Sequence, residues 1–174
     1  MGVFVAFLRA VNVGGTGKLP MADLRRLCED LGFERVTTYI QSGNVVFHSK
    51  LGKARVQREL ADALAAEMGK PVGVHVRTPG ELEAVLRKTP FAHAAPNKVI
   101  VFFLEKAPPP RALAGITIPG REEVVEAVGA HALVHYPDGQ GRSKLKLPFA
   151  ASGTGRNLNT VRKMLELARG DERG

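Results

Sequence analysis

Cysteine is almost absent from this chain of 174 residues, which has one, Cys28, and tryptophan is missing altogether. A single cysteine excludes an internal disulfide framework and suits a reducing compartment, so we expect a cytoplasmic protein. No apolar stretch approaches the roughly 18–20 residues that a membrane-spanning helix needs. With 6% aromatic residues, a surface that recognises nucleic acid by stacking on its bases is not expected.

Acidic residues are missing from one long segment, the stretch between Asp138 and Glu166. Six basic residues lie in that acid-free segment: Arg142, Lys144, Lys146, Arg156, Arg162 and Lys163. They supply +6 of the formal net charge of +8. Such a cluster attracts nucleic acid, nucleotides or other polyanions, but an ordinary solvated surface has the same composition.

Common catalytic signatures are also missing. The chain has no G-x-S-x-G, H-E-x-x-H or paired-carboxylate motif, and its five histidines lack metal-ligand spacing. The stretch 14–18 has the glycines and lysine of a P-loop. However, Asn12 stands at the first glycine of that motif and Leu19 at its metal-binding hydroxyl. We therefore predict no catalytic residue, no metal and no cofactor.

Strand and helix patterns alternate in the first half of the chain. Strands are expected at 3–9, 35–40, 44–48 and 72–77, and amphipathic helices at 20–31 and 52–68. This βαββαβ order predicts an α+β fold, the ferredoxin-like plait, with sheet order 4-1-3-2.

The second half repeats this pattern less cleanly. A helix is expected at 81–88, strands at 98–104, 122–128 and 131–136, a short helix at 143–150, and a last amphipathic helix at 158–168. Gly170 is expected to end that helix, with 171–174 frayed. We predict two domains, a plait over 1–78 and a second, related α/β domain over 79–174.

The strongest strands, 3–8 and 99–104, are apolar at successive positions. A sheet with one open face shows polar residues at alternate positions, so both faces of each sheet should be covered. The second face would be covered by the other domain or by a partner subunit, and a homo-oligomer is left open.

The plait topology brings three segments to one end of the first sheet, namely 9–18, 41–44 and 69–71. The glycine-rich loop 9–18 runs from a strand into a helix, which aims backbone N–H groups and a helix dipole at one point, as anion sites do. The candidate ligand-binding residues are Arg9, Asn12, Gly14, Gly15, Lys18, Gln41, Ser42 and Asn44. Arg156, Asn157 and Asn159 would join them if the last helix docks on the first domain.

Each candidate has a role in this hypothesis. The arginines and Lys18 supply charge, the glycines allow close backbone approach, and the amide and hydroxyl side chains supply neutral hydrogen bonds. The same residues also suit turns and helix caps, since Asn tolerates left-handed turns, and Asn157 or Thr154 is placed to cap the last helix.

Three motifs resemble those of one family. They are LRAVNVGG followed by KLPMADL from Leu8, YIQSGNVVF from Tyr39, and GTGRNLNTV from Gly153. Together they are similar to the bacterial family called domain of unknown function 1697. That family usually has Thr at the Gly155 position and Trp at the Leu158 position. The resemblance implies a small cytosolic bacterial protein built from two plait-like units, and it implies no activity.

The leading interpretation is binding of a phosphate-bearing ligand, either a nucleotide or a nucleic-acid backbone, by a protein without evident catalysis. The alternatives are an enzyme that acts on a phosphorylated or carboxylated small molecule at the same place, and a structural protein that works through a protein partner.

Overall fold

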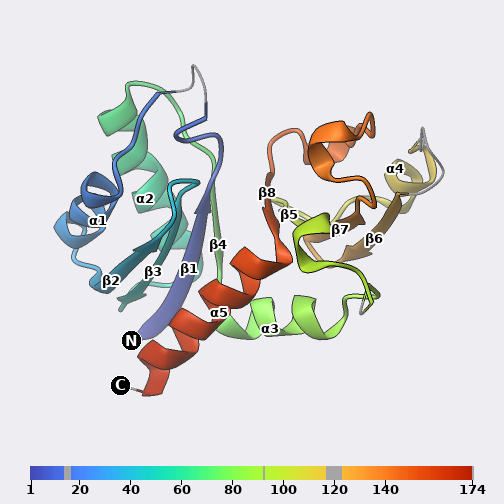
Figure 1. The fold of residues 1–174 in the computed structure, drawn as a ribbon. Coiled ribbons are helices and arrows are strands. Elements are labelled where there is room, and N and C mark those ends of the chain that lie inside the picture. Colours follow the sequence, from blue (N-terminus) through green and yellow to red (C-terminus); the bar gives the residue numbers. More distant parts are fainter. Residues whose placement is uncertain (14–16, 92, 117–122, 174) are drawn as a thin grey trace. The chain divides into compact units, whose positions relative to one another are not determined.

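The computed structural model describes residues 1–13, 17–91, 93–116 and 123–173. Contacts within the chain divide it into unit 1, which comprises Met1–Glu83 and Lys163–Gly174, and unit 2, which comprises Ala84–Arg162. The first division lies near the domain boundary expected at residues 78 and 79, and the last helix contributes residues to both units. Each unit contains one four-stranded antiparallel sheet (Figure 1).

Unit 1 has the strand and helix order expected from the sequence. Its elements are β1 (Gly2–Leu8), α1 (Met21–Asp30), β2 (Glu34–Tyr39), β3 (Asn44–Ser49), α2 (Lys53–Met68) and β4 (Val74–Arg77). The sheet order is β2-β3-β1-β4, and all neighbouring strands are antiparallel. This confirms the predicted ferredoxin-like plait.

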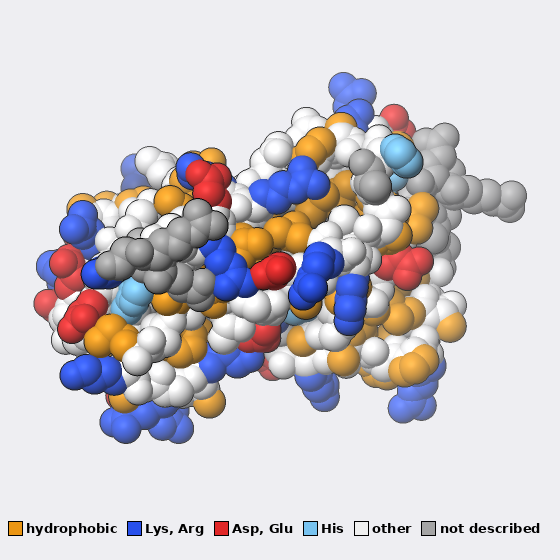
Figure 2. All heavy atoms as spheres, turned by 90° about the horizontal axis from the view of Figure 1, so that it is seen from below, with side chains coloured by type: hydrophobic (Ala, Val, Ile, Leu, Met, Phe, Trp, Pro, Cys, Tyr) orange, Lys and Arg blue, Asp and Glu red, His pale blue; other side chains and the backbone are white. Residues whose placement is uncertain are grey.

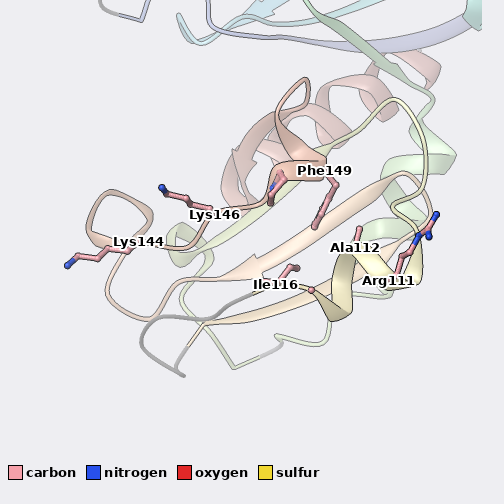
Figure 3. Close-up of a pocket in the computed structure, with 8 residues that line it drawn as sticks. Arg111, Ala112, Ile116, Lys144, Lys146 and Phe149 are labelled. Carbon is pink, nitrogen blue, oxygen red and sulfur yellow. The ribbon is translucent and has the colours of Figure 1, made fainter.

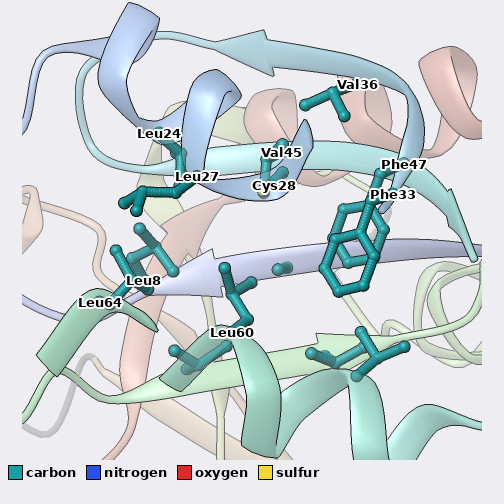
Figure 4. Close-up of a cluster of buried hydrophobic side chains, with 14 of the residues drawn as sticks. Leu8, Leu24, Leu27, Cys28, Phe33, Val36, Val45, Phe47, Leu60 and Leu64 are labelled. Atoms are coloured by element: carbon teal, nitrogen blue, oxygen red, sulfur yellow. The ribbon is translucent and has the colours of Figure 1, made fainter. Parts of the chain in front are cut away.

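The core of unit 1 lies between its sheet and helices α1 and α2. Apolar residues recur every three or four positions in both helices, so each helix buries one stripe, as at Leu24 and Cys28 in α1 and Leu60 and Leu64 in α2. Figure 4 shows these side chains directed toward the strands. Beside them the rings of Phe33 and Phe47 stack with centroids 4.4 Å apart.

The opposite face of each sheet is buried as well. Val5 and Phe7 on that face of unit 1 are fully buried, and so are Val101 and Phe103 in unit 2. The expectation that both faces are covered is therefore confirmed by burial.

Unit 2 repeats the sheet of unit 1 with fewer helices. After α3 (Pro79–Arg87), which crosses the division, come η1 (Pro96–Lys98), β5 (Val99–Phe103), α4 (Pro110–Ala114), β6 (Val124–Val128), β7 (His131–His135), η2 (Gln140–Arg142), η3 (Pro148–Ala150) and β8 (Thr154–Asn157). The last helix is α5 (Leu158–Arg173). The sheet order β6-β7-β5-β8 matches that of unit 1, strand for strand.

The register of the two sheets also corresponds. Phe7 is the cross-strand partner of Asn44 in unit 1, as Phe103 is of His131 in unit 2. In the same way Val5 is paired with Arg77, and Val101 with Arg156. Arg77 and Arg156 thus occupy equivalent places on the last strand of each sheet, and both are buried. Burial lowers the pKa of both guanidinium groups, because the charged form loses hydration.

Two expectations for the second half are wrong. The segment 143–147 is not helical, and only Pro148–Ala150 forms a single 3₁₀ turn. Lysine and leucine alternate there with a period of two, which suits an extended chain, and Pro148 lacks the N–H that a helix needs. Gly170 does not end α5, which continues to Arg173, so 171–173 are helical rather than frayed. Gly170 has no positive φ, unlike a glycine that ends a helix.

Within the described ranges, no helix is both long enough and apolar enough to cross a membrane.

Candidate functional site

Three loops meet at one end of the unit 1 sheet, as the topology predicts. They span 9–20, 40–43 and 69–73, and we call this region the loop end. The backbone N–H of Leu8 donates to the carbonyl of Gly43 over 2.9 Å, and that of Arg9 donates to the carbonyl of Gly73 over 2.9 Å. Residues far apart in sequence therefore become neighbours through main-chain bonds.

Asn12 joins the first two of these loops with its side chain. Its amide Nδ2 donates to the carbonyl of Leu19 over 2.8 Å and to the carbonyl of Gln41 over 2.8 Å. Its Oδ1 accepts from the N–H of Leu19 over 2.7 Å. Asn12 therefore closes its own loop and fixes that loop to the hairpin, so it shapes the site in addition to lining it.

The hairpin is likewise stabilised by the hydrogen bonds of an asparagine side chain. The Nδ2 of Asn44, a fully buried residue, donates to the carbonyl of Tyr39 over 2.9 Å and to Oγ of Ser42 over 2.9 Å. Gly43 lies between them at a φ of 89°, and a Cβ there would be 2.7 Å from Cγ2 of Val11. The hairpin thus packs directly on the first loop, which requires glycine at this position.

A pocket of about 580 Å³ opens at the loop end, and we call it the loop pocket. Its lining comes from 12–13, 17–20 and 41, which includes three predicted residues: Asn12, Lys18 and Gln41. Its volume is in the range of small-ligand sites. Pro20, which directly precedes α1, also lines it, and no side chain among the described residues caps that helix end. The positive end of the α1 dipole therefore lies at the pocket wall.

The loop end is rich in positive charge. Arg9 and Lys18 are exposed there, and the sequence of all three loops contains no Asp or Glu. The structure adds Lys70, which the sequence argument did not select although it placed the 69–71 turn here. The Nζ of Lys70 is 3.8 Å from the position of a Cβ on Gly17, a lining residue of the pocket.

The two carboxylates nearest to these loops along the chain, Glu67 and Asp23, already share a cationic partner, Arg26. Asp23, in the first turn of α1, lies 3.8 Å from the guanidinium of Arg26. That guanidinium also pairs with Glu67 at 3.2 Å.

The loop end contains unusual backbone conformations. Ala10, Asn12 and Ile40 have φ values of 55°, 57° and 49°. Asparagine tolerates this left-handed region, but Ile40 is β-branched and strained there. Strain of this kind is concentrated at binding and catalytic sites, where the surrounding bonds hold it in place.

Five predicted residues are not among those that the structure describes at the loop end. Gly14 and Gly15 fall outside the described residues. Arg156 and Asn157 belong to β8 and Asn159 to the first turn of α5, all in unit 2, where two of them have roles within that unit. Arg156 is buried and donates from Nη1 to Oγ1 of Thr154 over 2.6 Å and to the carbonyl of Gly155 over 2.9 Å.

Asn157 caps the last helix. Its Oδ1 accepts from the N–H of Thr160 over 2.9 Å, which is the bond of an N-cap residue. Asn159 is exposed in the first turn of α5. Burial lowers the pKa of Arg156 to about 10, so this guanidinium is held in a poorly hydrated place within its sheet.

In the part of the chain that the structure describes, no three His, Cys, Asp or Glu side chains gather as metal ligands would.

Comparisons with known proteins identify a family and a fold. A family model described as "Protein of unknown function (DUF1697)" matches residues 1–132. A solved structure of the conserved bacterial protein SP0830 from Streptococcus pneumoniae is similar with 24% sequence identity and a TM-score of 0.76. The alignment covers 95% of this chain and 98% of that chain, so the likeness extends over both units and shows the fold alone. No curated protein matches.

Proposed function

The chain belongs to the DUF1697 family, whose description gives no activity, and from its own residues we propose that unit 1 binds a phosphate-bearing ligand in the loop pocket. The ligand is a nucleotide or the backbone of a nucleic acid. We also propose that the protein works in the bacterial cytoplasm, as its single cysteine favours.

The observation that carries this proposal is the meeting of a ligand-sized pocket with an acid-free, cationic loop end. Lys18 lines the pocket, and Lys70 approaches it at Gly17. Overall charge alone would not support a site, because on the face in Figure 2 the Lys and Arg side chains are spread widely. At the loop end, charge, cavity and helix dipole coincide, and all three favour an anion.

Neutral groups complete the site. The exposed side chain of Gln41 lines the pocket, and the Asn12 bonds hold its two walls together. A preformed wall lowers the conformational entropy that the protein loses on binding, so a small anion can be held by few direct contacts.

The test is a titration of the full chain with AMP, ADP and a short single-stranded oligonucleotide at two salt concentrations. Lys18→Ala should weaken binding several-fold, because it removes one partly exposed ionic contact. Lys50→Ala is the matched control, since Lys50 is exposed after β3 at the other end of the same sheet. Circular dichroism checks that both variants fold.

If the oligonucleotide is the ligand, its affinity should fall steeply with salt, as expected when lysines displace counterions from phosphates. If Lys18→Ala and Lys50→Ala weaken binding equally, the binding depends only on the overall positive charge and not on the loop pocket. Absence of salt-sensitive binding to all three probes would reject the proposal and favour a structural role for the loop end.

A further inference from the structure

One face of the unit 2 sheet is covered by an extended segment where unit 1 has a helix. By register, Ile100 of β5 corresponds to Phe4 of β1, which packs in the core beneath α1 and α2. In unit 1 the chain between β3 and β4 forms α2. In unit 2 the chain between β7 and β8, all of it among the described residues, forms only the short turns η2 and η3.

Residues 143–147 lie between these two turns and sort their side chains to two sides. They alternate between half-buried and exposed, and Leu145 and Leu147 pack against the apolar cluster of the sheet. Figure 3 shows the charged ends of Lys144 and Lys146 directed outward. Because an extended chain presents only every second side chain to one face, two leucines cover the sheet where unit 1 uses a whole helix stripe.

This thin cover leaves a pocket of about 280 Å³ between the segment and the sheet, which we call the sheet pocket. Phe102 lines it from the sheet and Leu145 from the segment, and its lining contains no charged side chain. A Cβ on Gly155 would lie 3.0 Å from the ring of Phe102, so glycine on the neighbouring strand leaves room for that ring. Every lining residue and its neighbours along the chain are among the described residues.

Tyr136 provides an unused hydrogen-bond donor in this lining. It is 3% exposed, and within the described ranges its hydroxyl makes no hydrogen bond. Burial, with a smaller contribution from the Glu123 carboxylate, raises the pKa of this phenol to about 12, so it keeps its proton at neutral pH. The hydroxyl of Ser143, which also lines the pocket, already donates to Oε1 of Glu123 over 2.9 Å. A buried donor without a partner favours a ligand that brings an acceptor.

We propose that the sheet pocket binds a small, neutral, largely apolar molecule with one hydrogen-bond acceptor, to which the Tyr136 hydroxyl donates. The pocket has about twice the roughly 150 Å³ of an engineered cavity that holds benzene, so two fused six-membered rings fit it. An anion is disfavoured, because no cation lines the pocket and the Glu123 carboxylate lies near the phenol. Apolar pockets with a few directed polar groups are typical of small-molecule sites. The proposal does not depend on the loop pocket, which lies in unit 1.

The test titrates quinoline and naphthalene into the isotope-labelled full chain and follows the backbone amide shifts by NMR. The two probes have the same shape, but only quinoline carries an acceptor. Quinoline should bind about fivefold more tightly, as expected for one added neutral hydrogen bond. The largest shifts should lie at Tyr136 and residues 143–147.

Tyr136→Phe should weaken quinoline binding about fivefold, to the affinity of naphthalene, and leave naphthalene unchanged. The matched control is Tyr39→Phe, since Tyr39 is the second of the two tyrosines and lies on β2 of unit 1. Ala150→Leu should weaken both probes about tenfold, because the larger side chain fills the pocket that Ala150 lines. The amide spectrum of each variant also checks its fold.

Three results would each overturn the proposal. The first is an absence of shifts at the sheet pocket with either probe, or equal affinity for both. The second is an equal effect of Tyr136→Phe and Tyr39→Phe on quinoline. The third is unchanged binding in Ala150→Leu.

Discussion

The side-chain amide of Asn12 donates a hydrogen bond to the backbone carbonyl of Gln41, 29 residues further along the chain, over 2.8 Å. The same amide group also bonds Leu19. One side chain thus ties together two loops that belong to no common strand or helix. The geometry of the loop pocket therefore depends on this residue even if a ligand never touches it.

Replacing Asn12 by alanine should lower the free energy of unfolding by about 2 kcal/mol. The variant loses the bonds to Leu19 and Gln41 and leaves their backbone groups unsatisfied. Alanine is also disfavoured at a φ of 57°. Urea denaturation measures the change, and the matched control is Asn159→Ala, in which the amide is exposed on α5 and should matter little. Equal midpoints for the two variants would contradict the role of Asn12.

The sheet of unit 1 was predictable because short-range sequence patterns determine its strands and helices. Apolar alternation marked the strands, helical spacing marked α1 and α2, and the βαββαβ order then fixed which loops meet. The prediction that 9–18 and 41–44 converge needed no knowledge of a single side-chain contact, and main-chain bonds confirm it.

The details of the site were less predictable because they depend on long-range contacts. Nothing local shows that Asn12 bonds Gln41, or that Lys70 approaches Gly17. In unit 2 the alternation of lysine and leucine from Lys144 to Leu147 was available as a signal for an extended segment. A helix was nevertheless expected. Leucines and lysines are good helix formers, but propensity is a weak guide against a period of two.

Gly43 should tolerate no side chain. A Cβ there would lie 2.7 Å from Val11 and 2.9 Å from Leu8, and φ is 89°. We expect Gly43→Ala to destabilise the protein by about 2–4 kcal/mol through strain and overpacking together. Gly69→Ala separates the two effects, because Gly69 has a φ of 70° and no atom within 4 Å of its Cβ position. Comparable losses in both variants would show that the close packing of the hairpin on the first loop is unimportant.

The buried substitution Arg156→Ala should lower stability by about 2 kcal/mol. It removes the donor to Thr154 and Gly155 and leaves a space within the sheet. Arg156→Met should cost less, because it fills most of the space and removes the cost of burying a charge. Thermal melts of both variants measure this. An Arg156→Ala variant that keeps its full stability and instead loses ligand affinity would assign this arginine to binding.

Alkaline pH should destabilise the fold through Cys28. Burial, with a smaller contribution from Glu29, raises the pKa of its thiol from 9.0 to about 12. The folded state then holds its proton while the unfolded state releases it, so the stability present below pH 9 is lost as the pH rises toward 12. Between pH 8 and pH 10 the loss should be about 1 kcal/mol.

Urea midpoints of the wild-type protein and Cys28→Ala at both pH values isolate this effect, since all other groups are shared. At pH 8 the alanine variant should be less stable than the wild-type protein, but it should lose less stability between pH 8 and pH 10. Parallel losses in the two proteins would mean that the thiol ionises as readily in the folded state. A thiol reagent offers a second readout, because modification of Cys28 should be limited by unfolding.

Replacing Gly170 by alanine should stabilise the protein by about 0.5–1 kcal/mol. Glycine is the weakest helix former after proline, and Gly170 lies inside α5 with an ordinary helical φ and no atom within 4 Å of its Cβ position. The comparison is Gly32→Ala, where φ is 86° just beyond the C-cap residue of α1 and alanine should be destabilising. If Gly170 instead ended the helix in a left-handed conformation, both variants would lose stability, so the sign of the Gly170 change decides whether α5 continues through this residue.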